Sequence, residues 1–206
     1  MPSPTAHTCS KRFSDYPCCH RQWRHAGHCR FVHGYSRSFT CWFRAHHLDQ
    51  HGFVVDFSSL RKLEARLAHQ FDHTFLVNAD DPLLEQWRSL HEQGALDLRV
   101  MANVGMEASA ELVWSWANEL LHGREKGRAC CWRVEAREND RNAACYAATP
   151  AWFSPVPAQD IGDGYPEDAW PEGPAPEISY GVMEPEATGY GDEGTLPSGP
   201  EPWEAP

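Results

Sequence analysis

The stretch Ser36-Arg37-Ser38-Phe39-Thr40-Cys41-Trp42-Phe43-Arg44-Ala45 does most to determine the fold of this 206-residue chain, because its aromatic and other strand-favouring residues predict a long strand. Before it, Lys11–Arg21 is also expected to be extended, with Pro17 at an edge or a bulge. After it, Asp49–Gly52 predicts a turn, and Phe53–Phe57 is a short apolar run.

Two helices and further strands are predicted in the rest of the folded region. Ser58 or Ser59 can cap a helix that ends near Gln70, since leucines recur on it at helical spacing. The other predicted elements are a loop over 78–95, a short strand over Leu96–Met101, a helix over Ala108–His122 that Ser109 can cap, and strands over Ala129–Ala136 and Ala143–Ala148. Strands, then helices, then strands predict an α+β fold.

The acidic residues of the chain are unevenly distributed. Residues 151–206 contain 12 Asp and Glu but no Lys or Arg, whereas residues 1–150 contain 17 acidic and 18 basic residues. The C-terminal part also holds 11 of the 16 prolines and 8 of the 15 glycines, and it has few aliphatic residues to offset the entropy of ordering. We therefore expect one folded domain over 1–150 and a disordered acidic tail over 151–206, which is solubilising or, through its tryptophans, binds a partner.

The sequence predicts a cytoplasmic protein without a membrane partner. No stretch approaches the ~18 consecutive apolar residues of a membrane helix. The segment Met1–His7 lacks the charged and apolar regions of a signal peptide. The eight cysteines are then expected to be reduced, and the adjacent pairs Cys18–Cys19 and Cys130–Cys131 do not match a CxxC zinc spacing.

Histidines cluster around a lone cysteine just before the long strand. Cys29 stands four residues before His33, and His20 ends the preceding strand. His33 and Tyr35 share one face of a strand, so His20 can meet both across the strand pair. Catalytic zinc usually keeps three protein ligands and one open position, and His20 and His33 are candidates for two of the ligands. Any one histidine could instead pair only with backbone or solvent.

Other residues could take part in proton transfer or substrate binding. Cys29 near a cation would be a reactive thiolate, although the alternative is a small buried hydrophobe. Asp72 and His73 form a proton relay only if the chain bends so that their side chains converge. Otherwise His73 is a helix-terminal residue stabilised by the helix dipole. Glu138 follows the end of a predicted strand, where side chains often project into a cleft.

Basic residues are concentrated near these candidates. Seven Lys and Arg lie from Lys11 to Arg44, against one acid, Asp15. Such a region suits an anionic, for example phosphorylated, substrate. It would also suit nucleic acid, but no recognised nucleic-acid-binding motif accompanies it, so no nucleic-acid partner is expected. The remaining alternative is a solvated basic face.

The order and spacing of these residues resemble the 6-pyruvoyltetrahydropterin synthase / 6-carboxytetrahydropterin synthase family over about Phe13–Ala148. The matching elements, in chain order, are His20, Cys29-x3-His33-Gly34, Gly52-x-x-Val55-Asp56-Phe57, Asp72-His73 followed by Leu76 and Asn78, Ser109-Ala110-Glu111, and Glu138 eight residues before Tyr146.

The resemblance implies a tunnelling fold, in which an antiparallel sheet carries two helices on one face and subunits join as a trimer or hexamer. It implies 7,8-dihydroneopterin triphosphate as the substrate and Zn2+ as a Lewis acid. The product would be 6-carboxytetrahydropterin, a precursor of queuosine, or 6-pyruvoyltetrahydropterin in the other branch of the family. The implied residues are Cys29 as the base, Asp72 and His73 as a relay, Glu138 on the pterin ring, and Ser109 and Glu111 at the substrate.

Tyr35 departs from the family pattern, which is His-Gly-His with the second histidine as a zinc ligand. A free tyrosine phenol has a pKa near ~10, so metal binding would require its deprotonation. Three outcomes are open. Zinc is held by His20, His33 and a Tyr35 phenolate; or His28, His25 or Cys18 replaces Tyr35; or the site is weakened, leaving a pterin-binding protein with altered or no activity.

Overall fold

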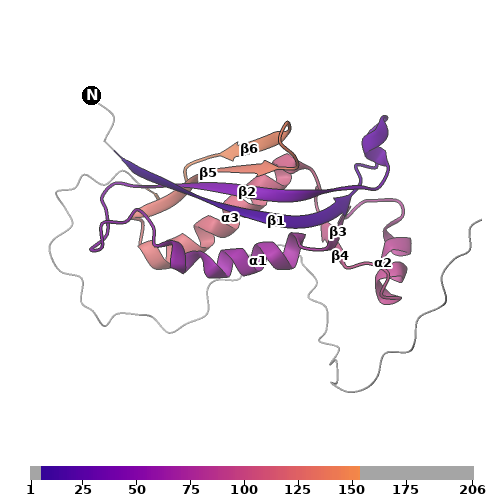
Figure 1. Ribbon diagram of the computed structural model, residues 1–206, viewed down its shortest axis with the longest axis horizontal. Helices are drawn as coiled ribbons and strands as arrows, with labels where there is room; N and C mark the ends of the chain where they lie inside the picture. Colours follow the sequence, from indigo (N-terminus) through magenta and orange to yellow (C-terminus); the bar gives the residue numbers. More distant parts are fainter. Residues whose placement is uncertain (1–5, 154–206) are drawn as a thin grey trace, which may run out of the picture. The chain divides into compact units, whose positions relative to one another are not determined.

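A computed structural model describes residues 6–153 of the chain, which form a six-stranded sheet with three α-helices (Figure 1). The order of the strands in the sheet is β4-β3-β1-β2-β5-β6. Their bounds are β1 His7–His20, β2 His33–Ala45, β3 Thr74–Asn78, β4 Leu98–Met101, β5 Ala129–Arg137 and β6 Ala143–Ala147. The combination of one sheet with separate helices confirms the α+β fold class.

The helices lie on the sheet unequally. Their bounds are α1 Arg61–Phe71, α2 Leu84–Glu92 and α3 Met106–Glu125, with short 3-10 turns η1 His28–Arg30 and η2 Phe57–Leu60. Helices α1 and α3 pack on one face, α1 mainly against β1 and α3 mainly against β5 (Figure 1). Helix α2 is attached at the β3–β4 end, where the Trp87 and Phe75 rings make an edge contact at 4.9 Å between centroids.

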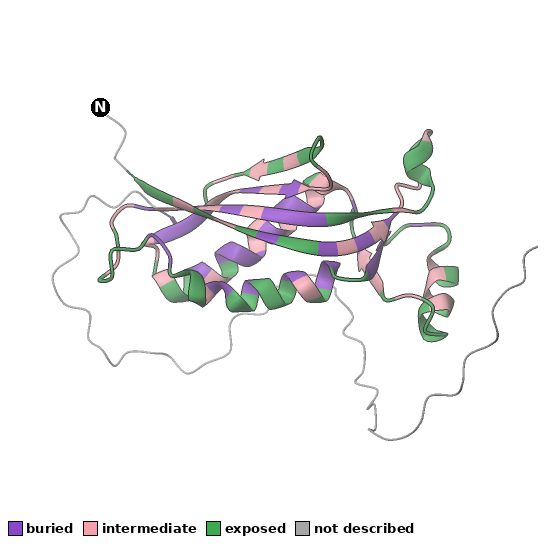
Figure 2. Cartoon of the chain, in the orientation of Figure 1, coloured by how far each residue is buried: buried purple, intermediate pink, exposed green. Residues whose placement is uncertain are grey.

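The hydrophobic core fills the space between the sheet and the two long helices. Along β1 and β2 the core face carries apolar side chains at alternate positions, among them Phe13, Phe39, Cys41 and Phe43, as expected for strands with one face buried. Figure 2 shows these buried stretches alternating with exposed ones along the strands. The same alternation continues to the end of the hairpin, where the core gives way to polar residues.

The β1–β2 hairpin forms the centre of the sheet. The two strands pair from His7–Ala45 to His20–His33, and the pairing shifts once between Phe13 and Tyr16. At that irregularity Asp15 has a φ of 71°, a left-handed conformation that Asp tolerates better than most residues. The shift places Tyr16, Cys18 and His20 on the helix-facing side of β1.

The structure differs from the sequence-based expectations in several places. Residues 78–95 are not all loop, because they include α2, and Thr74–Asn78 forms the unpredicted strand β3. Strand β3 pairs in parallel with both β1 and β4, so the sheet is not wholly antiparallel. Between β3 and β4 the chain forms α2, whereas β2 and α1 both lie between β1 and β3 in the sequence.

The predicted helix caps were also wrong. The Asp56 side chain, not Ser58 or Ser59, caps the turn before α1, because it accepts a hydrogen bond from Ser58 N at 2.8 Å. Helix α3 begins at Met106 with Gly105 as its N-cap, which puts Ser109 inside the helix. The predicted acidic tail over 151–206 lies outside the described residues except for its first three. No helix within residues 6–153 is long and apolar enough to cross a membrane.

Candidate functional site

Two histidine rings meet at the end of the β1–β2 hairpin. His20 and His33 are directly opposed in the ladder, and their ring centroids are 4.5 Å apart. Tyr35 lies two residues further along β2, with its ring edge-on to His33 at 5.8 Å. The register of the hairpin therefore brings the three candidate metal ligands together on one face, as the strand period predicts.

Each of the two imidazoles has a ring nitrogen that could bind a metal. His20 is 5% exposed, and burial, with Arg37 and His33 nearby, lowers its pKa to about 3, so the ring is neutral near pH 7. Its Nδ1 is buried without a hydrogen-bond partner among the described residues. The Nδ1 of His33 donates to the Phe31 carbonyl at 2.7 Å, because that oxygen can only accept, so Nε2 is the ring nitrogen that remains for a metal.

The third donor position is occupied by Tyr35, whose side chain is 40% exposed. Cys18 stands opposite it on β1, where burial raises the pKa of the thiol to about 11 and limits access to the sulfur. His25 is exposed, and its Nδ1 already accepts a hydrogen bond from Gly27 N at 3.0 Å. Within residues 6–153 no group of three or more His, Cys, Asp or Glu side chains is arranged to hold a metal.

Two imidazoles thus suit zinc, and the phenol of Tyr35 is the third donor that the hairpin places beside them. An orphaned nitrogen in a buried ring is costly unless a ligand or ion satisfies it, so His20 fits a metal-binding role. Of the three donors, only Tyr35 is not a residue type that usually binds zinc. The assignment of zinc to these residues stays a prediction.

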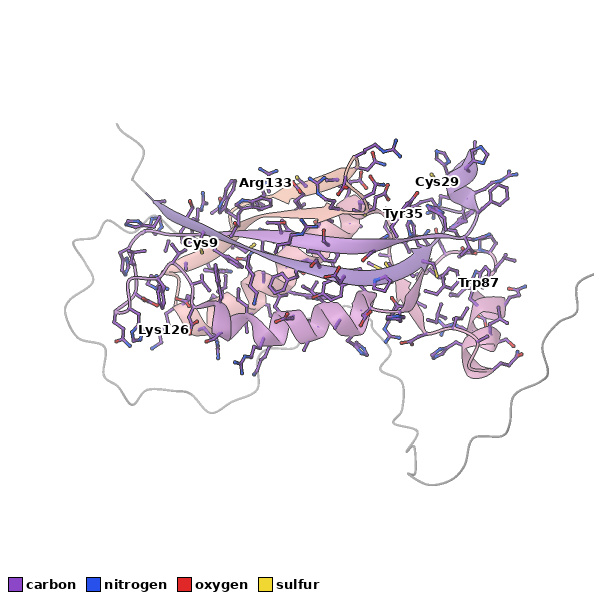
Figure 3. All side chains as sticks on the ribbon, in the orientation of Figure 1. Cys9, Cys29, Tyr35, Trp87, Lys126 and Arg133 are labelled. Carbon is purple, nitrogen blue, oxygen red and sulfur yellow. The ribbon has the colours of Figure 1, made fainter. Side chains whose placement is uncertain are left out.

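Cys29 lies on a loop that projects from the sheet between β1 and β2. Figure 3 shows it on the 3-10 turn η1, near the end of β2 that carries Tyr35. Its carbonyl accepts a hydrogen bond from Gln22 N at 2.8 Å, which fixes the loop, while its thiol is exposed. Within residues 6–153 no hydrogen bond joins the thiol to His20 or His33. An exposed thiol on a fixed loop is accessible to a substrate.

Asp72 and His73 form a side-chain pair at the turn between α1 and β3. His73 adopts a φ of 54°, and this bend brings its Nδ1 to 2.6 Å from Asp72 Oδ1. The backbone N of His73 donates to the Pro17 carbonyl at 2.7 Å, which attaches the turn to β1. The carboxylate can hold the ring in one orientation, as a catalytic relay requires.

One groove contains several of these residues. Its volume is about 560 Å³, and it is lined by Pro17–Cys19, Gly34–Ser36, His73–Phe75 and Ala95–Asp97. Tyr35 from β2 and His73 from the α1–β3 turn therefore border the same space, although they are far apart in sequence. Gly34 is required in its wall, since a Cβ there would lie 2.9 Å from the Cys18 carbonyl oxygen.

The three remaining predicted residues occupy different environments. Glu138 is half-buried after β5, and its Oε1 accepts hydrogen bonds from Asn142 Nδ2 at 3.0 Å and Asn139 Nδ2 at 3.4 Å. Ser109 is fully buried, and its hydroxyl donates to the Gly105 carbonyl at 2.9 Å. Glu111 is exposed on α3. Of the three, Glu138 and Glu111 have carboxylates that a substrate could reach in this chain.

A family model described as 6-pyruvoyl tetrahydropterin synthase matches residues 8–149. The chain belongs to this family. The sequence already showed the resemblance, and the match covers the three helices and, apart from His7, all six strands described. No curated protein sequence matches the chain.

Solved structures of low sequence identity share this pterin synthase fold. An uncharacterised protein from Wolinella succinogenes has a TM-score of 0.59 at 19% identity, over 69% of this chain and 98% of the other. A 6-pyruvoyltetrahydropterin synthase from Plasmodium vivax has a TM-score of 0.53 at 15% identity, over 69% and 97%. The Plasmodium falciparum enzyme has a TM-score of 0.51 at 15% identity, over 68% and 96%. At these identities the likeness concerns the fold, and it confirms the tunnelling fold.

Arg37 lies beside the candidate site of this pterin synthase family member, and the sequence did not single it out. Its side chain is fully buried, and it donates from Nη1 to Ser109 Oγ at 2.7 Å and from Nη2 to the Val104 carbonyl at 2.9 Å. Arg37 shares a strand face with His33 and Tyr35 by the period of two, which is the signal that could have found it. In the sequence it appeared only as one more cation of the basic region.

The connection after β3 also has a buried polar anchor that the sequence did not indicate. Arg21 follows His20 and makes two hydrogen bonds to Asp81, from Nε at 2.7 Å and from Nη2 at 2.8 Å. The Asp81 side chain is fully buried, and it also accepts from Leu83 N at 2.8 Å. This pair ties the end of β1, where His20 lies, to the start of α2.

Proposed function

We propose that this family member is a zinc-dependent lyase that converts 7,8-dihydroneopterin triphosphate to 6-carboxytetrahydropterin. The observation that carries the proposal is the opposed pair His20 and His33, whose rings are 4.5 Å apart with lone pairs available for a metal. The family fold and the groove beside Tyr35 support a pterin-sized ligand.

His20, His33 and Tyr35 would hold the zinc. When bound, the ion would polarise the hydroxylated side chain of the pterin and acidify its O–H and C–H groups. The neutral His20 ring need not lose a proton to bind it, whereas Tyr35 must release its phenolic proton. Binding of zinc by Tyr35 is therefore the part of the coordination that depends most on the protein environment.

The protein groups proposed for proton movement lie on two loops. The Cys29 thiolate would accept a proton from the substrate side chain, since the thiol is exposed on the η1 turn beside the ligand end of β2. His73, oriented by Asp72 at 2.6 Å, would complete the relay. Glu138 would hold the pterin ring by accepting two parallel hydrogen bonds. We expect the active form to be a cytoplasmic homo-oligomer, a trimer or hexamer.

Two alternatives remain within the family. The first is 6-pyruvoyltetrahydropterin synthase activity, which is the name carried by the Plasmodium relatives of the same fold. The second is a pterin-binding protein without turnover, which Tyr35 in the ligand position favours. The two differ from the main proposal in product identity and in turnover, not in fold.

Metal content and product analysis test the proposal together. The natural protein should contain about one zinc per chain and release triphosphate and acetaldehyde with 6-carboxytetrahydropterin, identified by mass spectrometry. A Cys29→Ser variant should keep its metal and lose about 10²–10⁴-fold in turnover, the usual contribution of a general base. Pterin binding without metal or product would identify the degenerate protein instead, and a pyruvoyl product would identify the other branch.

A further inference from the structure

Arg37 is a buried cation that forms no ion pair within residues 6–153. Its side chain is fully buried, and the guanidinium donates to two neutral groups, the Ser109 hydroxyl at 2.7 Å and the Val104 carbonyl at 2.9 Å. The guanidinium carbon lies 5.8 Å from the centre of the Phe71 ring, and Nε has no hydrogen-bond partner in the described range. A buried charge is costly unless an opposite charge compensates it, so these contacts alone do not account for the arginine.

Glu138 is the carboxylate that the sheet places opposite Arg37. Strands β2 and β5 are antiparallel neighbours, and their ladder includes the pair Phe39–Ala136 (Figure 1). Continuing the ladder by two positions sets Arg37 against Glu138, on the same face as these two core residues. Opposed residues of an antiparallel pair have Cβ atoms about 4.5–5.5 Å apart. Burial lowers the pKa of Arg37, and the nearby Cys18 and Glu138 act in the opposite direction, which agrees with this placement.

The two opposed side chains do not occupy each other's hydrogen-bonding groups. Both terminal nitrogens of Arg37 are held at the start of α3. Glu138 Oε1 accepts from Asn142 and Asn139, whereas Oε2 accepts no hydrogen bond in the part of the chain that the structure describes. Arg37 therefore supplies a positive charge beside the carboxylate and leaves Oε2 available to a ligand.

A bound pterin would increase the importance of this charge. A ring that covers the half-buried Glu138 removes water from the carboxylate, which disfavours its charged form. The attraction between opposite charges strengthens as water is excluded, because the effective dielectric constant falls. A carboxylate that keeps its charge can accept two parallel hydrogen bonds from the ring, and a fixed cation on the protein side favours that state.

We propose that Arg37 is a positioning residue that acts through Glu138, holding the carboxylate in place and compensating its negative charge when a pterin binds. The inference rests on the proposed function, because it takes Glu138 as the residue that holds the pterin ring. Arg37 acts without touching the ligand, which agrees with its complete burial.

Neopterin binding in a double-mutant cycle tests this coupling. Fluorescence titration gives the dissociation constant of neopterin for the natural protein, Arg37→Met, Glu138→Gln and the combination of the two. Arg37→Met should weaken binding about tenfold when Glu138 is present, and less than about twofold when it is combined with Glu138→Gln. A residue that only supports the local structure would cause the same loss in both backgrounds.

Equal losses in the two backgrounds, or no loss in Arg37→Met, would overturn the proposal. A natural protein that does not bind neopterin would instead contradict the proposed function. The charge pair itself is then tested by stability, in a measurement that needs neither a ligand nor a folded Arg37→Met variant.

Urea unfolding of the ligand-free protein provides this second test. Glu138→Gln keeps an oxygen that can accept from Asn142 but removes the charge opposite Arg37. The equilibrium constant for unfolding should rise about tenfold, between the effects of exposed and of buried ion pairs. Glu92→Gln, at an exposed position of α2, is the matched control and should change the constant no more than about twofold. An effect of Glu138→Gln as small as that of the control would overturn the proposal.

Discussion

Tyr35 and Cys18 stand directly opposite each other in the β1–β2 ladder, on the face that also carries His20 and His33. The third donor of the proposed zinc site is therefore expected to be the phenol, the buried thiol or a group from outside this face. Both groups must lose a proton to bind zinc, but the phenol is exposed whereas the thiol is buried, so the phenol is the more accessible of the two. The position is suited to substitution, since Tyr35 is 40% exposed and its replacement opens no core cavity.

Substitutions at Tyr35 should change zinc affinity in opposite directions. Tyr35→His should bind zinc about 10–100-fold more tightly, because a neutral imidazole needs no deprotonation. Tyr35→Phe should bind about tenfold or more weakly if the phenolate is a ligand. Competition with a chromophoric chelator measures both. Cys18→Ala is the matched control, and a loss of affinity there but not in Tyr35→Phe would assign the third ligand to the thiol.

His73 can be tested without disturbing the fold. Its φ of 54° is a conformation that Asn tolerates well, so His73→Asn should change the free energy of unfolding by less than about 0.5 kcal/mol. If His73 completes the relay with Asp72, turnover should fall by about 10²–10⁴-fold. His69→Asn, at an exposed position of α1, is the control for loss of a surface histidine. Unchanged turnover in His73→Asn would remove the residue from the mechanism.

Arg37 should be a major contributor to stability. Replacing it with Met removes two hydrogen bonds from a buried cation and leaves the Val104 carbonyl without that partner, at a cost of about 3 kcal/mol. Denaturant unfolding measures the change. Arg66→Met is the control, because Arg66 is half-exposed, pairs with Glu119 at 2.9 Å, and should cost no more than about 1 kcal/mol. Equal stability of Arg37→Met and the natural protein would mean that burying the charge costs as much as its hydrogen bonds return.

Strong periodicity is what made most of the fold predictable from the sequence. The β1–β2 hairpin, β5 and the two long helices each bury one face, so alternation or helical spacing appears in the sequence. Strand β3 was missed because all five of its residues are buried, which removes the alternation. Helix α2 was missed for the opposite reason: no residue in it is buried, and the Asp80-Asp81-Pro82 run before it predicts a turn.

The candidate site was predictable only where local spacing determines it. His20, His33 and Tyr35 follow from the strand period once the hairpin is assumed. The same period places Arg37 on the face of His33 and Tyr35, but it does not distinguish a buried arginine from a solvated one, and only the position of α3 behind it shows that it is buried. Asp81 likewise fell in the loop predicted over 78–95. Its contact with Arg21 depends on the placement of β3 beside β1.

The Arg21–Asp81 pair should make the stability of the protein depend on pH in the acid range. Burial alone would raise the Asp81 pKa, but hydrogen bonds from Arg21 and Leu83 N outweigh it, and the pKa is lowered overall. The contribution of the pair is therefore complete above the unfolded-state pKa of ~3.9 and is lost as the pH falls through the lower folded-state pKa. Asp81→Asn should cost about 3 kcal/mol at pH 7, as for removal of one partner of a buried pair, and progressively less at acid pH. Urea unfolding at a series of pH values measures this, with the exposed neighbour Asp80→Asn as a control that should cost no more than about 1 kcal/mol. A cost for Asp81→Asn that stays constant into the acid range would show that the carboxylate charge does not stabilise this connection.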